Sequence, residues 1–202
     1  MNKKERIKRV ATILFAANGI RNTKIEDIAS SMGIAKGGMY YYYKSKEVLL
    51  EDIIEDSVLS REEFIENMKI LNLSFNDKIK LFIKRRIDLK DDRYNLFLFS
   101  KIYENGEINL TKDEYMKKDI FFGEFFDENK KYLKDEYQVE IEKIKQFITA
   151  SLTRLLTILI NQTGIVVKDE ESYKKMVYKY SQINLDKEIE LFFNLFFKEI
   201  LK

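Results

Sequence analysis

The side chains best suited to bind phosphate lie in a short segment of lysine, glycine and tyrosine, residues 36–46. Lys36 carries a positive charge that can reach a phosphate or the edge of a base. Gly37 and Gly38 lack side chains, so a ligand can approach the backbone closely, where the N–H groups at the start of a helix favour anions. Lys24, at the start of the preceding apolar stretch, is a further candidate for a phosphate contact. This pattern favours a nucleic acid as the partner.

The composition gives little support to other kinds of chemistry. The chain contains no histidine and no cysteine, which removes the usual general base, thiolate metal ligands, disulfides and a cysteine nucleophile. Neither a glycine-rich nucleotide loop nor a G-x-S-x-G nucleophile motif occurs. The acidic pairs Asp91-Asp92 and Glu170-Glu171 are typical of solvated charges rather than of metal ligands. We therefore expect no enzyme, no metal site and no cofactor, although an acid–base pair of lysine and carboxylate stays open.

The charges are distributed unevenly along the chain. Residues 1–50 contain ten basic and four acidic side chains, a net charge of +6, so residues 51–202 carry −4 against the total of +2. A basic first quarter on an acidic remainder is typical of a protein whose N-terminal end meets phosphate. Charge alone also fits a short first helix that is merely solvated, so the prediction depends on the elements that hold these residues.

Two short helices joined by a glycine turn are predicted to position the basic segment. Thr23 and Glu26 have the spacing of a capping box at the start of the first of them. Gly33 can adopt the positive φ that ends this helix, and the second helix is expected from about Ala35 to Tyr42. One face of the first helix is apolar: Ile25, Ile28, Ala29 and Met32. This order matches a helix-turn-helix, which lays its second helix in the major groove of DNA.

Residues 5–50 resemble the N-terminal DNA-binding domain of the TetR family of transcriptional regulators. The resemblance includes a preceding helix, Ile7 to Asn18, and an ordered run from Gly33 to Glu47 of glycines, a lysine, aromatics and Ser-Lys-Glu. Two positions depart from the family pattern. Ala35 replaces the usual capping serine, which weakens the helix start by about 1 kcal/mol, and Gly38 replaces a residue with a hydroxyl that relatives often aim at DNA.

The resemblance also assigns roles to the tyrosines and to the second lysine. It implies that Tyr40 and Lys46 contact phosphates and that Tyr42 touches the DNA backbone or bases. The alternative is that these tyrosines pack the core of the small domain, and we expect this for Tyr43, which stands where the family has a buried phenylalanine. Tyr41 is expected to be exposed.

Two domains are predicted, a helix-turn-helix domain at residues 1–47 and a larger helical domain at residues 48–202. The chain has no proline and seven glycines, so long helices are permitted throughout and an all-α fold is expected. No apolar run approaches the ~20 residues that cross a bilayer, and no secretory segment opens the chain. A cytoplasmic location without membrane contact is expected.

The larger domain is expected to consist of successive helices separated by polar breaks. Ser45 opens a long helix, Ser74 or Asn76 caps the next one, and Thr111 with Glu114 has the spacing of another capping box. The expected long helices span Ser45 to Ile70, Glu136 to Gln162 and, with a break near Asn184, Glu170 to Lys202.

The last two long helices predict a homodimer. The final helix carries apolar residues over about half its circumference, more than a single core face requires, so one side is expected to meet a second subunit. Phe193 and Phe197 are taken as positions that face the partner. The family resemblance implies a four-helix bundle across a two-fold axis. The alternative is a terminal helix inserted into the core of a monomer.

Aromatic residues of the larger domain are candidates for a small-molecule effector pocket, a use that the family makes of this domain. Phenylalanines at helical spacing are more often simply core. Arg86 and Arg154, on otherwise apolar faces, would bind an anionic group of the ligand or a protein carboxylate. The aromatic candidates are Phe82, Tyr94, Phe97, Phe99, Tyr103, Tyr115, Phe122, Phe125 and Phe126.

The combined prediction is a dimeric transcriptional repressor that binds a pseudo-palindromic double-stranded DNA operator. A hydrophobic or amphipathic ligand in the larger domain would weaken the binding of DNA. The main alternative is a helical adaptor with a vestigial helix-turn-helix whose aromatic C-terminal face binds protein, and an all-α enzyme is more distant.

Overall fold

The computed structural model describes residues 2–89, 125–138 and 140–202, and these form helices without a strand ladder, as the all-α prediction required. The only pairing of extended residues in the described ranges is an isolated bridge between Leu133 and Leu201. None of the helices in these ranges is long and apolar enough to cross a bilayer. The helices are α1 Lys3–Asn18, α2 Ile25–Ser31, α3 Lys36–Tyr42, α4 Lys46–Ile70, α5 Phe75–Ile87, the 3-10 helix η1 Lys130–Tyr132, α9 Asp135–Gln138, α10 Ile141–Gln162, α11 Glu170–Tyr180 and α12 Leu185–Phe196.

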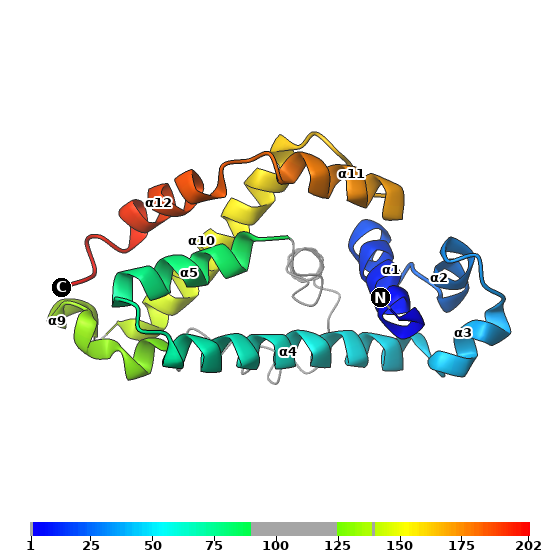
Figure 1. The fold of residues 1–202 in the computed structure, drawn as a ribbon, viewed down its shortest axis with the longest axis horizontal. Coiled ribbons are helices and arrows are strands. Elements are labelled where there is room, and N and C mark those ends of the chain that lie inside the picture. The colour runs from blue at the N-terminus through cyan, green and yellow to red at the C-terminus, as the bar shows by residue number, and fades with distance from the viewer. Residues whose placement is uncertain (1, 90–124, 139) are drawn as a thin grey trace.

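The molecule is elongated, with α1, α2 and α3 gathered at one end as a head (Figure 1). The long helix α4 runs from this head along one edge of the molecule, and α11 and α12 follow the opposite edge. Helix α5 packs against α10 and α12, which places the main body of the protein beside α4. The C-terminus lies at the end opposite the head (Figure 1).

The head has its own apolar core, which fixes α2 and α3 against α1. Helix α1 begins with a capping box, in which the side chain of Asn2 accepts from the Glu5 N–H at 2.9 Å and the Glu5 carboxylate accepts from the Asn2 N–H at 3.0 Å. Met39 anchors α3 in this core. The other buried residues of the head include Ile7, Val10, Leu14, Phe15, Ile25, Ile28, Ala29, Met32 and Tyr43.

The turn between α2 and α3 follows the prediction. Gly33 has φ +66°, a backbone conformation in which a residue with a side chain would be strained. Ala35 precedes α3 and gives this helix no side-chain cap. Ser45 and Ser74 cap the helices that follow them: their hydroxyl oxygens accept from the N–H groups of Val48 at 3.3 Å and of Asp77 at 3.1 Å.

The predicted capping box of Thr23 and Glu26 is wrong. The residue that precedes α2 is Lys24, and its backbone N–H donates to the carboxylate of Asp27 at 2.7 Å. The hydroxyl of Thr23 is buried and donates to the Gly19 carbonyl at 2.8 Å, so it closes the turn after α1 and is not available to α2. Packing of the turn therefore displaces the cap by one residue.

Two helix limits of the larger domain also differ from the prediction. The long helix begins at Ile141 rather than near Glu136, and the last one ends at Phe196 rather than at Lys202, although the break at Asn184 is present. The predicted start near Glu136 falls in the separate short helix α9, which ends at Gln138, and α10 begins at Ile141. The end of the chain pairs with the segment around Tyr132, through the Lys134 N–H to the Ile200 carbonyl at 3.0 Å and the Lys202 N–H to the Tyr132 carbonyl at 2.9 Å, so the last residues do not continue the final helix. The expected helix after Thr111 lies outside the described residues.

A cluster of charged groups around Asp52 joins the head to α4. The carboxylate of Asp52, on α4, accepts from the Tyr43 hydroxyl at 2.6 Å and pairs with Lys4 at 2.9 Å and Lys8 at 3.6 Å. Lys8 also pairs with Asp56, one turn further along α4. Partial burial opposes ionisation of Asp52, but the hydrogen bonds from Tyr43 and Lys4 outweigh it and hold the pKa of Asp52 below its ordinary value. The cluster therefore ties α1, the end of α3 and α4 together.

We predict that Asp52→Asn lowers the free energy of unfolding at neutral pH by about 1 kcal/mol, because it removes a charge-assisted acceptor from three donors. A carboxyl group whose pKa is lower in the folded state than in the unfolded state stabilises the fold fully above the unfolded-state pKa, about 4. This stabilisation is lost as the pH falls through the folded-state pKa. The difference between the parent and the variant in urea unfolding should therefore shrink below about pH 4. Glu51→Gln, at the exposed neighbouring position, is the control. Equal stability of Asp52→Asn and the parent at neutral pH would contradict the role of the cluster.

Candidate nucleic-acid interface and effector site

Helix α3 exposes its basic and tyrosine-rich face. Met39 and Tyr43 point into the core of the head, and the side of α3 opposite to them is left in solvent. Tyr41 is the most exposed aromatic residue of this helix, with 83% of its surface accessible. The burial of Tyr43 and the exposure of Tyr41 confirm the predictions for these two residues. The exposed positions of α3 are Lys36, Gly37, Gly38, Tyr40 and Tyr41.

Lys36 is held by an ion pair on the surface of the head. Its ammonium lies 2.5 Å from the carboxylate of Glu26, on α2, and 5.7 Å from the centroid of the Tyr40 ring. The hydrogen bond between the two groups lowers the pKa of Glu26 and raises the pKa of Lys36. Exposed pairs of this kind contribute little to stability. An incoming phosphate can therefore replace Glu26 as the partner of Lys36.

Lys46 has a structural contact that its sequence position did not predict. Its ammonium donates to the carbonyl of Ile20 at 2.6 Å and so connects the first turn of α4 to the turn after α1. An ammonium group has three donors, so this bond leaves two for other acceptors. Lys24 is exposed at the start of α2, on the same head.

Tyr42 lies partly in the core and partly at the surface. Its ring meets the ring of Tyr41 edge-on, with 5.1 Å between centroids, and the ammonium of Lys3 lies 5.9 Å from its centroid. The structure thus places Lys24, Lys36, Gly37, Gly38, Tyr40 and Tyr42 on the head. Lys46 lies beside them, in the first turn of α4. The structure adds Lys3 and Tyr41, which the sequence analysis did not include among the candidates. The basic N-terminal stretch was the signal for Lys3, and exposure alone identifies Tyr41.

Those predicted effector residues that the structure describes are divided between the core and the surface. Phe82, Phe125 and Phe126 are core residues, and Phe126 stacks on Phe197 with 6.1 Å between ring centroids. Arg86 is buried on α5, as its apolar face suggested. Arg154 is exposed on α10, so its helical face is not buried at this position, although the surrounding apolar residues had suggested that it would be. The remaining candidates, Tyr94, Phe97, Phe99, Tyr103, Tyr115 and Phe122, lie outside the described residues.

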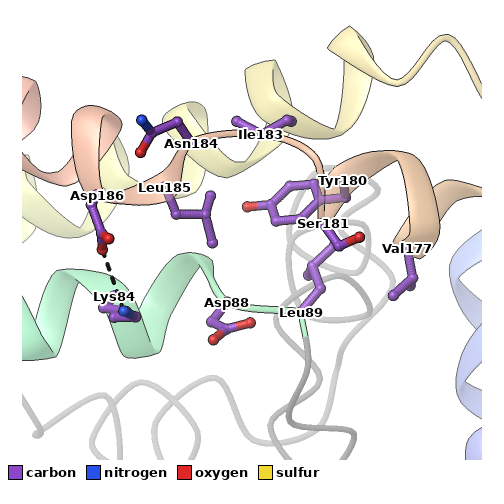
Figure 2. Close-up of a pocket in the computed structure, with 10 residues that line it drawn as sticks. All are labelled: Lys84, Asp88, Leu89, Val177, Tyr180, Ser181, Ile183, Asn184, Leu185 and Asp186. Carbon is purple, nitrogen blue, oxygen red and sulfur yellow. Dashed lines mark hydrogen bonds and ion pairs between the residues drawn. The ribbon is translucent and has the colours of Figure 1, made fainter.

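One hollow in the described part of the chain lies where α11 meets α12, against the end of α5 (Figure 2). Its volume is about 220 Å³, and none of the predicted effector residues lines it. The described residues also contain no group of carboxylates arranged to hold a metal ion. The lining consists of Lys84, Asp88, Leu89, Val177, Tyr180, Ser181, Ile183, Asn184, Leu185 and Asp186.

The apolar residues at the C-terminal end are divided between core and surface differently from the prediction. Phe193 and Phe197 are buried in the chain's own core, so they do not face a partner. Leu191 and Leu195, one turn apart on α12, are exposed instead. The periodic pattern identified the helix as two-sided, but only the packing against α5 decides which side is inside.

The comparisons with known proteins agree with this geometry. Residues 7–53 match the model of the bacterial regulatory proteins of the tetR family. The transcriptional repressor KstR2 of Mycolicibacterium smegmatis is 34% identical over 55 residues, a match that covers 27% of each chain. The negative transcriptional regulator IcaR of the biofilm operon icaADBC from Staphylococcus aureus is 24% identical over 91% of this chain and 100% of its own length. A crystal structure of a transcriptional regulator from Saccharomonospora viridis in complex with choline has a TM-score of 0.64 at 13% identity and covers 98% of this chain and 97% of its own.

We predict that Gly37→Ala and Gly38→Ala each raise the free energy of unfolding by about 0.5–1 kcal/mol, the helix cost of glycine relative to alanine. Neither glycine has a positive φ, and a Cβ at either position meets no atom within 4 Å. Urea unfolding provides the measurement. Gly33→Ala, at φ +66°, is the matched control and should destabilise the chain. A loss of stability in Gly37→Ala or Gly38→Ala would show that the chain itself needs these glycines.

Proposed function

We propose that this chain, which belongs to the tetR family of bacterial regulatory proteins, is a DNA-binding transcriptional repressor released from its operator by a small ligand. The observation that carries the proposal is the helix-turn-helix match of residues 7–53 together with the exposed basic face of α3. Repression is proposed because KstR2 is a transcriptional repressor and IcaR is a negative transcriptional regulator. Release by a small ligand is proposed because the structural neighbour from Saccharomonospora viridis was crystallised in complex with choline.

In the proposed complex, α3 enters a major groove of double-stranded DNA. Lys36 exchanges Glu26 for a phosphate or a base edge, and Gly37 and Gly38 allow the DNA to approach the backbone of α3. Lys24, Lys46 and Tyr40 bind phosphates, and Tyr42, with its exposed neighbour Tyr41, contacts the backbone or the bases. The DNA-binding domain is residues 1–47, and the effector-binding domain is residues 48–202.

The proposed active form is a homodimer through α10 and α12, which places two heads on a pseudo-palindromic operator. The exposed apolar residues of these helices provide the interface. Phe147 lies against Phe196 with 5.5 Å between ring centroids, so the exposed edges of α10 and α12 are continuous there. Arg154 and Ile158 lie on the same face of α10 as Phe147 because they follow it by two and three helical turns. Leu191 and Leu195 extend the surface onto α12.

The proposal is tested by selecting duplexes that the protein binds from a pool of random sequence and measuring the affinity for them at several salt concentrations. A DNA-binding dimer should enrich a pseudo-palindrome and show a steep negative slope of log affinity against log salt. A protein that enriches no sequence and binds random duplex without salt dependence would be the adaptor with a vestigial helix-turn-helix.

We predict opposite effects for the two members of the surface pair on the head. Lys36→Gln should weaken operator binding and reduce the magnitude of the salt slope by about one. Glu26→Gln should tighten binding, because Lys36 no longer has to leave a carboxylate. Fluorescence anisotropy of a labelled operator measures the affinity of both variants. Lys175→Gln, whose ammonium pairs with the exposed Glu171 at 2.6 Å on α11, is the matched control and should bind as the parent does. A Lys36→Gln variant with unchanged affinity and slope would remove Lys36 from the interface.

We predict that Leu191→Glu combined with Leu195→Glu converts the dimer to a monomer, since it places charge in an apolar interface. Analytical ultracentrifugation at micromolar concentration measures the change. Ile70→Glu, at an apolar position with 81% of its surface exposed outside α10 and α12, is the control and should stay dimeric. A parent protein that sediments as a monomer, or a doubly substituted variant that stays dimeric, would contradict this interface.

A further inference from the structure

Arg154 carries a positive charge that has no counterpart on its own helix. It is exposed on α10 and shares a helical face with the exposed Phe147 and Ile158. The carboxylate that α10 itself contains, Glu142, is roughly three turns away and pairs with Lys145 at 2.6 Å. Arg154 forms no ion pair with any residue that the structure describes. A protein surface that covers this face of α10 therefore has to supply an acceptor for the guanidinium.

Glu188 is the carboxylate of α12 that does not pair with α5. Helix α12 contains three acidic side chains. Asp186 pairs with Lys84 at 3.3 Å and Glu190 pairs with Lys80 at 2.6 Å, both across to α5. Glu188 lies between them in sequence and therefore on the other side of the helix. It forms no ion pair within the described ranges of the chain.

The surroundings of Glu188 are apolar or neutral. It precedes Leu191 by three residues and Leu195 by seven, so it shares the exposed face of these two leucines. Burial raises the pKa of Tyr180, and the negative charges of Asp88 and Glu188 raise it further. The phenol of Tyr180 stays neutral and does not compensate the carboxylate. The half-buried Glu188 thus faces the proposed dimer surface with its charge unpaired.

The two unpaired charges lie at the same level of the proposed bundle. Phe147 of α10 meets Phe196 of α12 with 5.5 Å between ring centroids. Both helices lead from this contact towards α11, which α10 precedes and α12 follows (Figure 1). At the rise of an α-helix, Arg154 lies about 10 Å along α10 from the contact and Glu188 about 12 Å along α12.

A two-fold axis brings residues of one level together across the interface. In the proposed dimer both heads bind one operator, so the axis runs from the heads through the bundle. Rotation about this axis keeps each residue at its own height. With α10 of one protomer beside α12 of the other, the guanidinium of Arg154 therefore meets the level of Glu188, and symmetry repeats the contact on the other side.

We propose that Arg154 of one protomer pairs with Glu188 of the partner subunit, once on each side of the two-fold axis of the homodimer. This inference rests on the proposed homodimer and names the polar contact within its apolar interface. Arg154 would then have the protein carboxylate that its place on an apolar helix face requires, because a charge that loses water without a partner is costly.

The pair acts on alignment more than on affinity. Opposite charges across an interface fix the register of the two surfaces, and like charges exclude wrong alignments. The register of α10 against α12 of the partner in turn sets the separation of the two heads. Arg154 and Glu188 are therefore positioning residues for the binding of a pseudo-palindrome.

Two charge reversals test the pair. Arg154→Glu places carboxylates opposite each other on both sides of the axis, and Glu188→Arg does the same with guanidinium groups. Each variant alone should dimerise at least about tenfold more weakly than the parent. In a heterodimer of the two variants, both contacts are again between opposite charges. Native mass spectrometry of the variants, unfolded and refolded together, should therefore find well above the roughly one half of heterodimer that random pairing gives.

The matched controls make the same changes of charge outside the interface. Lys175 and Glu171 form an exposed pair on α11 at 2.6 Å. Lys175→Glu and Glu171→Arg should each dimerise as the parent does, and their mixture should contain the statistical share of heterodimer. A chain that carries both Arg154→Glu and Glu188→Arg should dimerise with itself but form few heterodimers with the parent, because both contacts would then be between like charges.

The outcomes separate the pair from the dimer. A statistical share of heterodimer in the mixture of Arg154→Glu and Glu188→Arg, with a dimeric parent, overturns the pair and leaves the proposed dimer standing. A pair within one chain gives this same result, since mixing subunits cannot repair it. A parent that sediments as a monomer at micromolar concentration overturns the proposed dimer and the pair with it.

Neutral variants give a second measurement if a charge reversal prevents folding. Arg154→Gln and Glu188→Gln combined in one chain should weaken the dimer no more than either substitution alone, because each already removes the interaction. Sedimentation at a series of concentrations measures the three dissociation constants. Losses of affinity that add in the double variant overturn the pair.

Discussion

The carboxylate of Asp52 holds together the parts of this protein that have to keep a fixed relation to one another. It receives the Tyr43 hydroxyl from the end of α3, Lys4 from α1, and lies on α4, which continues without interruption into the body. Because α4 is a single helix of 25 residues, a head fixed at Asp52 turns with α4 as a unit. The orientation of α3 relative to α4 therefore depends on this charged cluster together with the apolar core of the head, in which Met39 is buried.

Helix α3 would not persist alone. It has seven residues, begins after Ala35 without a side-chain cap and contains two glycines, whereas isolated helices shorter than about 12–15 residues are marginal even with favourable sequences. Its shape comes from Met39 and Tyr43, which are buried in the head. The buried side of α3 thus stabilises the helix, and its exposed side can carry residues that contact a partner. The exchangeable pair of Lys36 and Glu26 belongs to that outer side.

The sequence predicted the local features well because each depends on neighbouring residues. Gly33 ends α2 with a positive φ, Ser45 and Ser74 cap their helices, and Asn184 breaks the final helical region. The failures arose where a distant segment supplied the deciding contact. The hydroxyl of Thr23 donates within the turn after α1, and the end of the chain pairs with the segment around Tyr132, so the last helix does not reach Lys202.

By itself, the sequence determined the helical class of the protein, its helix-turn-helix and the basic and tyrosine-rich face of α3, since composition, capping residues and periodicity act over a few turns of chain. Only the tertiary structure decided which apolar residues are inside. Phe193 and Phe197 enter the core while Leu191 and Leu195 stay exposed, because α12 packs one side against α5. The sequence did not reveal the hollow either, since Asp88 and Asp186 are nearly a hundred residues apart and line it together only because the end of α5 lies against the joint of α11 and α12.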